Sequence, residues 1–121
     1  MNVSHEIPGI EEYVSLREAA GLGSKDAAAA EAALGRTIFA ATVRDDGAAL
    51  IGMGRIIGDG GCYYRIVDVA VHPSRRGEGV EEALMAELLA YLDRSAPADA
   101  EVTVVSDAAS IPFYQKHGFK L

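Results

Sequence analysis

The sequence predicts a single domain of mixed α/β class, and three observations support this prediction. The chain has 121 residues, of which 50% are hydrophobic and 24% are charged, which suits one folded core. Apolar residues recur first at helical spacing, then in short β-prone runs, and later at helical spacing again. Glycine-rich turns separate the segments, and the sequence contains no linker and no internal repeat. We therefore expect one domain over residues 1–121.

Two helices are predicted near the start of the chain. A rough apolar stripe with a period near 3.6 covers residues 10–20, with Pro-Gly before it and Gly21 after it. Residues 25–34 are rich in alanine, which has the highest helix propensity. Ser24 and Asp26 are both suitable N-caps for this second helix, and Gly35 is expected to end it.

Three strands are predicted next. Residues 37–43 and 48–57 are β-prone runs joined by Asp-Asp-Gly, a hairpin signal. Gly52 and Gly54 in the second run indicate either a bulge or a close backbone neighbour. After a glycine-rich turn, residues 62–71 form the third apolar run.

A helix, a strand and a helix complete the chain. Apolar residues between 80 and 92 recur at helical spacing, which is the clearest helical pattern in the sequence. Residues 101–105 (EVTVV) predict a short, nearly uncharged strand. The final helix is expected to run to about His117, with Asp107 as a candidate N-cap and Gly118 at its end.

Charge and cysteine content limit the classes of function. The net charge of -7 argues against a nucleic-acid partner and is compatible with a cationic substrate or simply with solubility. No apolar run is long enough to span a membrane. The single cysteine, Cys62, excludes an internal disulfide and is expected to be a small buried residue. No basic leader or cleavable apolar stretch opens the chain, so we expect a cytoplasmic protein.

The most informative motif joins the third strand to the long helix: Arg75-Arg76-Gly77-Glu78-Gly79-Val80. Glycines at such a turn let backbone N–H groups approach an anion, and the helix N-terminus adds partial positive charge. One interpretation is a pyrophosphate site, and the other is a glycine-rich connection with solvated arginines. No Gly-Lys-Ser/Thr follows, which excludes a Walker loop, and the glycines do not follow the first strand as in a dinucleotide fold.

A second stretch narrows these alternatives. Residues 111–121, IPFYQKHGFKL, follow the stretch IVDVAVHPSRRGEGV in order along the chain. Together they resemble the GNAT superfamily of acyl-CoA-dependent N-acetyltransferases, over nearly the whole chain. The resemblance implies a twisted mixed β-sheet flanked by helices, acetyl-CoA as co-substrate, a small amine or N-terminal amine as acceptor, and a homodimer. The three histidines lack metal-ligand spacing, so no metal is expected.

The resemblance also implies roles for single residues. The strand backbone at Val69, Ala70 and Val71 would pair with the pantetheine arm of acetyl-CoA, and Asp107 would contact the same arm. The pyrophosphate would lie among residues of the loop and the first helical turn: Arg75, Arg76, Gly77, Glu78, Gly79, Val80 and Glu81. Tyr114 matches a tyrosine that contacts the cofactor and protonates the departing thiolate, which suits a phenol of pKa near 10. Tyr114 can equally pack the last helix on the sheet.

The general base is assigned from the residues alone. An amine must lose its proton before it attacks a thioester, and Asp68 on the third strand is the best-placed carboxylate for this step. The competing interpretation is that Asp68 pairs with an arginine such as Arg65 or Arg55. Weaker candidates for the base or for lining the substrate site are Glu11, Glu12 and Tyr63.

Two departures from the family pattern bear on activity. Glu81 replaces the small residue that ends the loop motif, and Glu78 and Glu82 stand where the family often has Lys or Arg. The chain also stops at Leu121, before the strand that usually completes the sheet, so we expect an exposed edge beside residues 101–105 and a homodimer that covers it. The alternatives to a catalyst are a degenerate or engineered GNAT-like module with weak or no CoA binding, acting as a binding or assembly unit, and a generic phosphate-binding domain.

Overall fold

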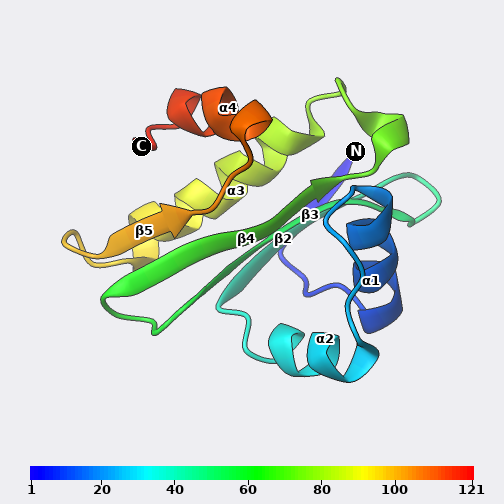
Figure 1. Ribbon diagram of the computed structural model, residues 1–121, viewed down its shortest axis with the longest axis horizontal. Coiled ribbons are helices and arrows are strands. Elements are labelled where there is room, and N and C mark those ends of the chain that lie inside the picture. Colours follow the sequence, from blue (N-terminus) through cyan, green and yellow to red (C-terminus); the bar gives the residue numbers. More distant parts are fainter.

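The computed structural model describes residues 1–121, in which four α-helices flank one five-stranded sheet (Figure 1). The strands are β1 (Asn2–Ser4), β2 (Phe39–Arg44), β3 (Leu50–Gly58), β4 (Tyr63–Val71) and β5 (Glu101–Val104). The α-helices are α1 (Ile10–Ala19), α2 (Ala27–Leu34), α3 (Val80–Ser95) and α4 (Ile111–Lys116). Two short 3-10 turns, η1 (Pro73–Arg75) and η2 (Ala108–Ser110), precede α3 and α4 respectively.

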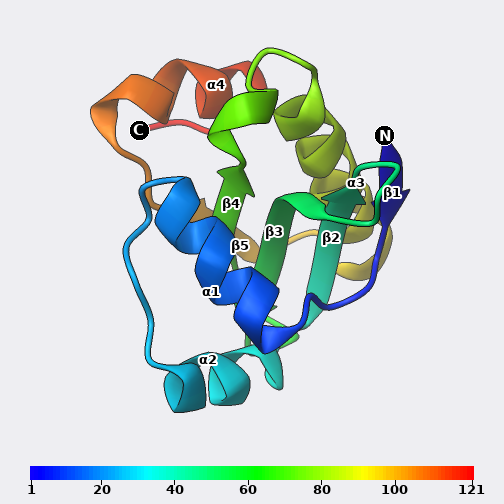
Figure 2. The same cartoon turned by 90° about the vertical axis from the view of Figure 1, so that its right-hand side faces the viewer.

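The strand order in the sheet follows the sequence from β1 to β5. Neighbouring strands are antiparallel except β4 and β5, which are parallel because α3 crosses between them. Helices α1 and α2 cover one face of the sheet, and α3 covers the other (Figure 2). This mixed sheet between helices confirms the predicted fold class. None of the helices combines the length and the apolar character that crossing a membrane requires.

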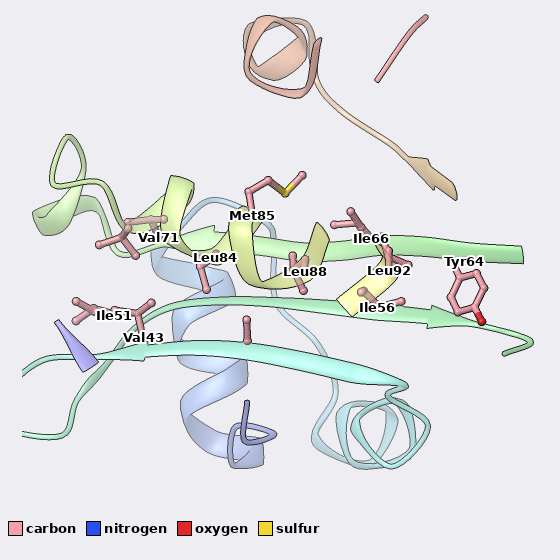
Figure 3. Close-up of a cluster of buried hydrophobic side chains, with 12 residues drawn as sticks. Val43, Ile51, Ile56, Tyr64, Ile66, Val71, Leu84, Met85, Leu88 and Leu92 are labelled. Atoms are coloured by element: carbon pink, nitrogen blue, oxygen red, sulfur yellow. The ribbon is translucent and has the colours of Figure 1, made fainter. Parts of the chain in front are cut away.

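Two apolar cores lie on the two faces of the sheet. The larger core lies between α3 and the strands, and Figure 3 shows the apolar stripe of α3 that forms it: Leu84, Met85, Leu88 and Leu92. These positions recur every three or four residues, so they share one face of the helix. The smaller core packs Tyr13 and Leu16 of α1 with Met53 of β3 and Ala70 of β4. Strand β4 therefore contributes side chains to both cores.

Gly52 and Gly54 explain how closely α3 approaches β3. A Cβ atom at Gly52 would lie 2.5 Å from Cγ1 of Val80, and one at Gly54 would lie 2.9 Å from Cδ1 of Leu88. The expected close neighbour is thus the helix on the larger core. The register between β3 and β4 also shifts across Gly54, so an irregular pairing occurs at this position as well.

The structure corrects two predictions made from the sequence and selects between two alternatives that the sequence left open. Strand β1 was not predicted, because three residues carry no detectable periodicity and only pairing with β2 defines the strand. Cys62 is exposed in the turn before β4, so the expectation of a buried cysteine is wrong. Of the two candidate caps for α2, Asp26 is the N-cap and accepts from the Ala29 N–H at 3.1 Å.

Over residues 1–121, β5 is an edge strand of the sheet. No further strand pairs with its outer edge. Val105, the residue after the strand, is 73% exposed, and Leu121 is 95% exposed. The edge therefore presents unpaired backbone groups beside apolar side chains.

Candidate functional site

Strands β4 and β5 are paired over a short distance and then separate. The paired positions run from Tyr63 opposite Glu101 to Ile66 opposite Val104, and they stop there. The chain after β5 turns away from β4 toward α4 (Figure 1). From Val67 onward, β4 therefore has no strand neighbour on its β5 side.

A β-bulge in β4 lies at the same place. Met53 pairs with Ala70 and Arg55 pairs with Val67, so three steps along β4 oppose two steps along β3. Within this bulge Asp68 has a φ of 57°, a left-handed conformation that is uncommon for residues other than glycine. Bulges redirect side chains, and this one determines where Asp68 points.

The bulge changes which face of the sheet the side chains of β4 point to. Tyr64 and Ile66 pack in the core beneath α3, and so do Val69 and Val71. Ile66 and Val69 are three residues apart, whereas side chains on one face of a regular strand alternate with period 2. The extra residue absorbs this difference. Asp68 consequently contacts α1 instead of entering the apolar core.

A cleft of about 420 Å³ lies where the two strands separate. Its lining comes from β4, from β5 and the segment after it, from α4, and from Arg17 and Leu22 near the end of α1; it includes Val67, Val69, Ser106, Asp107 and Tyr114. Asp107 also caps η2, since its Oδ1 accepts from the Ser110 N–H at 2.9 Å. Asp68 of the bulge and Tyr114 of α4 thus line the same cleft.

Tyr114 is held by aromatic packing around α4. Its ring lies edge-on to Phe113 and Phe119, with centroids 5.3 Å and 6.0 Å away. Burial raises the pKa of the Tyr114 phenol, and the carboxylates of Glu81 and Asp107 raise it further. The phenol therefore keeps its proton at neutral pH and is available as a donor.

Asp68 lines the cleft but already has three donors. Its Oδ1 accepts from Nη1 of Arg17, and its Oδ2 accepts from Nε of Arg55 at 2.9 Å and from the hydroxyl of Tyr13 at 2.6 Å. Burial and the Asp68 carboxylate raise the pKa of Tyr13, which keeps its hydroxyl a donor. The arginine-pairing interpretation of Asp68 is thus observed with Arg55, whereas Arg65 makes no such contact.

The same cluster ties both N-terminal helices to the sheet. Nη2 of Arg17 donates to the Leu22 carbonyl at 2.8 Å. Nη1 of Arg55 donates to the Ala33 carbonyl of α2 at 3.3 Å and to Oγ1 of Thr37 at 2.8 Å. Sequence reasoning missed Tyr13 and Arg17 as members of the site. The available signal was an arginine four residues after a tyrosine within the apolar stripe of the first helix, a spacing that places both on one face.

The glycine-rich loop forms a second cavity, of about 260 Å³, at the N-terminus of α3. Gly77 and Gly79 have φ of 81° and 82°, left-handed values that the turn requires and that glycine adopts at little cost. The first N–H groups of α3 have no partner within the helix, so they are available to an anion. Arg76 contributes a positive charge to the cavity lining.

The second loop arginine is engaged by the protein itself. Arg75 forms an ion pair with Glu78 at 3.1 Å and lies 3.7 Å from Asp45. Although Arg75 lines the loop cavity, its charge is therefore offset by two carboxylates. Glu78 does not line the loop cavity, and its carboxylate accepts a hydrogen bond from Nη1 of Arg75.

Two further glutamates lie at the start of α3 and line the loop cavity. Glu82 pairs with Lys116 of α4 at 3.5 Å. Glu81 has no ion pair, and its pKa is raised, first by burial and then by the neighbouring charge of Glu82. A carboxylate therefore faces the space that the loop glycines and the helix N-terminus leave open.

Most of the predicted site residues line one of these two cavities. The cleft is lined by Asp68, Val69, Asp107 and Tyr114. The loop cavity is lined by Val71, Arg75, Arg76, Gly77, Gly79, Val80 and Glu81. The side chain of Ala70 instead packs in the core beneath α1 and α2.

The weaker base candidates line neither cavity. The carboxylate of Glu12 accepts from Nη2 of Arg44 at 2.7 Å, and this pairing lowers the pKa of Glu12. Glu11 is exposed on α1, and Tyr63 is 59% exposed at the first position of β4. The structure does not bring these three residues to the bulge.

Comparison with known proteins gives one family match. A family model described as an acetyltransferase (GNAT) domain matches residues 17–121. A solved protein of unknown function from meticillin-resistant Staphylococcus aureus, described as a probable acetyltransferase, is 36% identical, with a TM-score of 0.94 and coverage of 99% of this chain and 90% of that one. No curated protein matches the chain.

Two further solved structures share the fold at lower identity. A GNAT family acetyltransferase from Streptococcus pneumoniae is 23% identical, with a TM-score of 0.81 and coverage of 99% of this chain and 87% of that one. A GNAT family acetyltransferase from Brucella melitensis, solved in complex with acetyl-CoA, is also 23% identical, with a TM-score of 0.72 and coverage of 99% and 82%.

Proposed function

The chain belongs to the GNAT family of acetyltransferases, and on that premise we propose that it transfers an acetyl group from acetyl-CoA to a primary amine. The observation that carries the proposal is the separation of β4 from β5 at the Asp68 bulge. This separation opens a cleft that Tyr114 lines, and β4 itself leads from the cleft to the loop cavity at α3.

The two cavities suit the two ends of acetyl-CoA. The loop cavity offers Arg76, open glycine backbone and a helix N-terminus to the pyrophosphate. The cleft offers the free edge of β4 at Val69, along which the amides of the pantetheine arm would pair as an added strand does. Two lining carboxylates oppose this fit: Glu82, which pairs with Lys116, and Glu81, which has no ion pair.

Acetyl-CoA supplies the activated acyl group as a thioester. The amine would attack the thioester carbonyl directly, through a tetrahedral intermediate that a backbone N–H near Val69 would stabilise. Tyr114 would donate its proton to the departing thiolate, a role supported by its place in the cleft and its raised pKa.

In this proposal Asp68 acts chiefly as a positioning residue. It joins the bulge to Arg17 of α1 and to Arg55 of β3, and both of its oxygens accept hydrogen bonds. Its role as the general base stays a prediction. To remove the proton of the amine, Asp68 would need a free lone pair directed at the amine or at a bridging water, in addition to the hydrogen bonds that its oxygens already accept.

Binding and turnover test the proposal separately. Calorimetric titration with CoA should give a dissociation constant in the micromolar range, and acetyl-CoA with a panel of primary amines should give amine-dependent release of free thiol. Absence of both would contradict the proposal and would support a module that has lost catalysis.

We further propose a homodimer in the cytosol. The edge of β5 beside Val105 and Leu121 is exposed, and a second copy would cover it by a two-fold contact. The exposed thiol of Cys62 would stay reduced in the cytosol.

A further inference from the structure

The buried charges around Asp68 do not balance. The guanidinium groups of Arg17 and Arg55 share this single carboxylate, and neither forms an ion pair with any other residue. All three side chains are buried, with exposed fractions of 11%, 6% and 8% for Arg17, Arg55 and Asp68. The Nε atom of Arg17 is also buried without a hydrogen-bond partner. Because an unpaired buried charge is costly, this cluster favours an anion that the chain itself does not supply.

Helices α1 and α2 cover one face of the sheet (Figure 2), and a cavity of about 350 Å³ adjoins the cluster on that face. We call it the α1–α2 cavity, and its lining includes Tyr13, Lys25, Ala33, Arg55 and Arg65. It shares four lining residues with the cleft: Arg17, Arg65, Val67 and Asp68. A molecule in the α1–α2 cavity would therefore lie next to the bulge, where the acetyl group is proposed to be transferred.

The rim of this cavity adds two cations to the two buried ones. Lys25 directly precedes the N-cap of α2, and Arg65 lies on β4, two residues before Val67. Both side chains are exposed, and neither forms an ion pair with a carboxylate of the protein. The lining thus holds four basic side chains and one acidic one, although the whole chain has a net charge of -7.

We propose that the α1–α2 cavity binds an anionic group of the acceptor, so that the substrate is a primary amine that also carries a carboxylate or a phosphate. A simple alkylamine is a cation at neutral pH, and four basic side chains would repel it. An anionic substituent reverses this effect, because guanidinium groups bind carboxylate and phosphate oxygens through charge-assisted hydrogen bonds. This inference rests on the proposed acetyl transfer and names its substrate class.

Matched pairs of amines test the substrate class. The first pair is 4-aminobutyrate and n-butylamine, and the second is O-phosphoethanolamine and ethanolamine, each assayed with acetyl-CoA by thiol release. We expect kcat/KM to be at least about 10-fold higher for the anionic member of a pair. The pair with the larger difference identifies carboxylate or phosphate as the preferred group. Equal or higher kcat/KM for both neutral amines would overturn the proposal.

Variants of the rim test whether this cavity is the site. Arg65→Gln should lower kcat/KM for the anionic amines about 10-fold more than it lowers kcat/KM for n-butylamine. The matched control is Arg36→Gln, which removes an exposed arginine that lines neither cavity and should leave all four values unchanged. Equal effects of the two variants on the anionic amines would contradict the assignment.

A binding measurement separates this inference from the proposed function. Titration of 4-aminobutyrate and of inorganic phosphate into the CoA-free protein should show binding that Arg65→Gln weakens and Arg36→Gln does not. If no amine is acetylated but this binding pattern is observed, the proposed function fails and the anion site stands. If neither probe binds, or if binding is insensitive to Arg65→Gln, the inference fails whatever the turnover.

Discussion

Nε of Arg55 on β3 donates to Oδ2 of Asp68 on β4 at 2.9 Å, at the point where the β3–β4 register shifts. The pair therefore bridges the β-bulge and the regular strand beside it. Because both side chains are buried and Asp68 also lines the cleft, one contact supports the stability of the sheet and the geometry of the site.

The first prediction concerns this pair. Asp68→Asn removes the carboxylate that two buried guanidinium groups share, and it should lower the free energy of unfolding by about 3–5 kcal/mol. Thermal denaturation measures the change, expected as a fall in Tm of roughly 10 °C or more. The control is Asp46→Asn, an exposed carboxylate of the β2–β3 turn that has no ion pair. Equal stability of the two variants would show that Asp68 does not balance the arginines.

The second prediction concerns Tyr114. Tyr114→Phe removes the proposed proton donor but keeps the ring that packs against Phe113 and Phe119. We expect kcat to fall about 100-fold while the dissociation constant for CoA changes less than about 2-fold. Tyr91→Phe, a tyrosine of α3 stacked on Phe39, is the matched control and should retain kcat. Full activity of Tyr114→Phe would remove the assigned role.

The third prediction concerns Glu81 and pH. Burial and the charge of Glu82 raise the pKa of Glu81, and in its ionised form this carboxylate faces the loop cavity proposed for the pyrophosphate. If a phosphate charge lay about 6 Å from the Glu81 carboxylate, their repulsion would be roughly 3 kcal/mol at an effective dielectric of 20. Solvent screening of this half-exposed carboxylate reduces the repulsion to about 1 kcal/mol. Glu81→Gln should therefore strengthen CoA binding at pH 7 about 5-fold.

The pH dependence follows from the same charge. As the pH falls through the raised pKa, Glu81 becomes neutral and wild-type affinity for CoA should rise toward that of Glu81→Gln. The charged neighbours Glu82, Lys116, Arg76 and His117 are present in both proteins, so the difference between the two titrations isolates Glu81. Asp93→Asn removes a charge from an exposed position of the same helix and serves as the control. A constant ratio of affinities at all pH values would contradict the prediction.

The fourth prediction concerns the contact between β3 and α3. In Gly52→Ala the new Cβ would lie 2.5 Å from Cγ1 of Val80, the first residue of α3. We expect a loss of about 1–3 kcal/mol in the free energy of unfolding and weaker CoA binding, because the start of α3 must move. Chemical denaturation measures the stability of the single variants and of Gly52→Ala with Val80→Ala. The double variant should be more stable than the sum of the two single effects predicts, since it removes the clashing atom.

The fifth prediction concerns the exposed edge of β5. Light scattering at micromolar concentration should give the mass of a homodimer, and Val105→Lys should shift it to the monomer, because a charge beside an edge strand opposes pairing between copies. Ile7→Lys, a change at another exposed apolar residue, should leave the dimer intact. A monomeric wild-type mass that does not change with concentration would show the prediction wrong.

The elements from α1 onward and the glycine-rich loop before α3 were predictable because their signals are local, whereas β1 was not. The apolar stripe of α3 follows helical spacing, and the left-handed turns at Gly77 and Gly79 require glycine whatever surrounds them. The arginine pairing of Asp68 was one of two interpretations that the sequence left open. Neither Arg17 nor Tyr13 was identified as its partner, because they lie 51 and 55 residues away along the chain.

By itself, the sequence determined the class of fold, the order of its elements from α1 onward and the loop that a phosphate would suit. Only the tertiary structure decided that β4 contains a bulge, that β5 separates from it, and that four basic side chains line one cavity around Asp68. The physical reason is that helices and turns are set by neighbours along the chain. Which face of the sheet the β4 side chains point to depends instead on the register between β4 and β3. The charge of the α1–α2 cavity depends on side chains from four elements or connections, which meet only when the sheet and its helices pack.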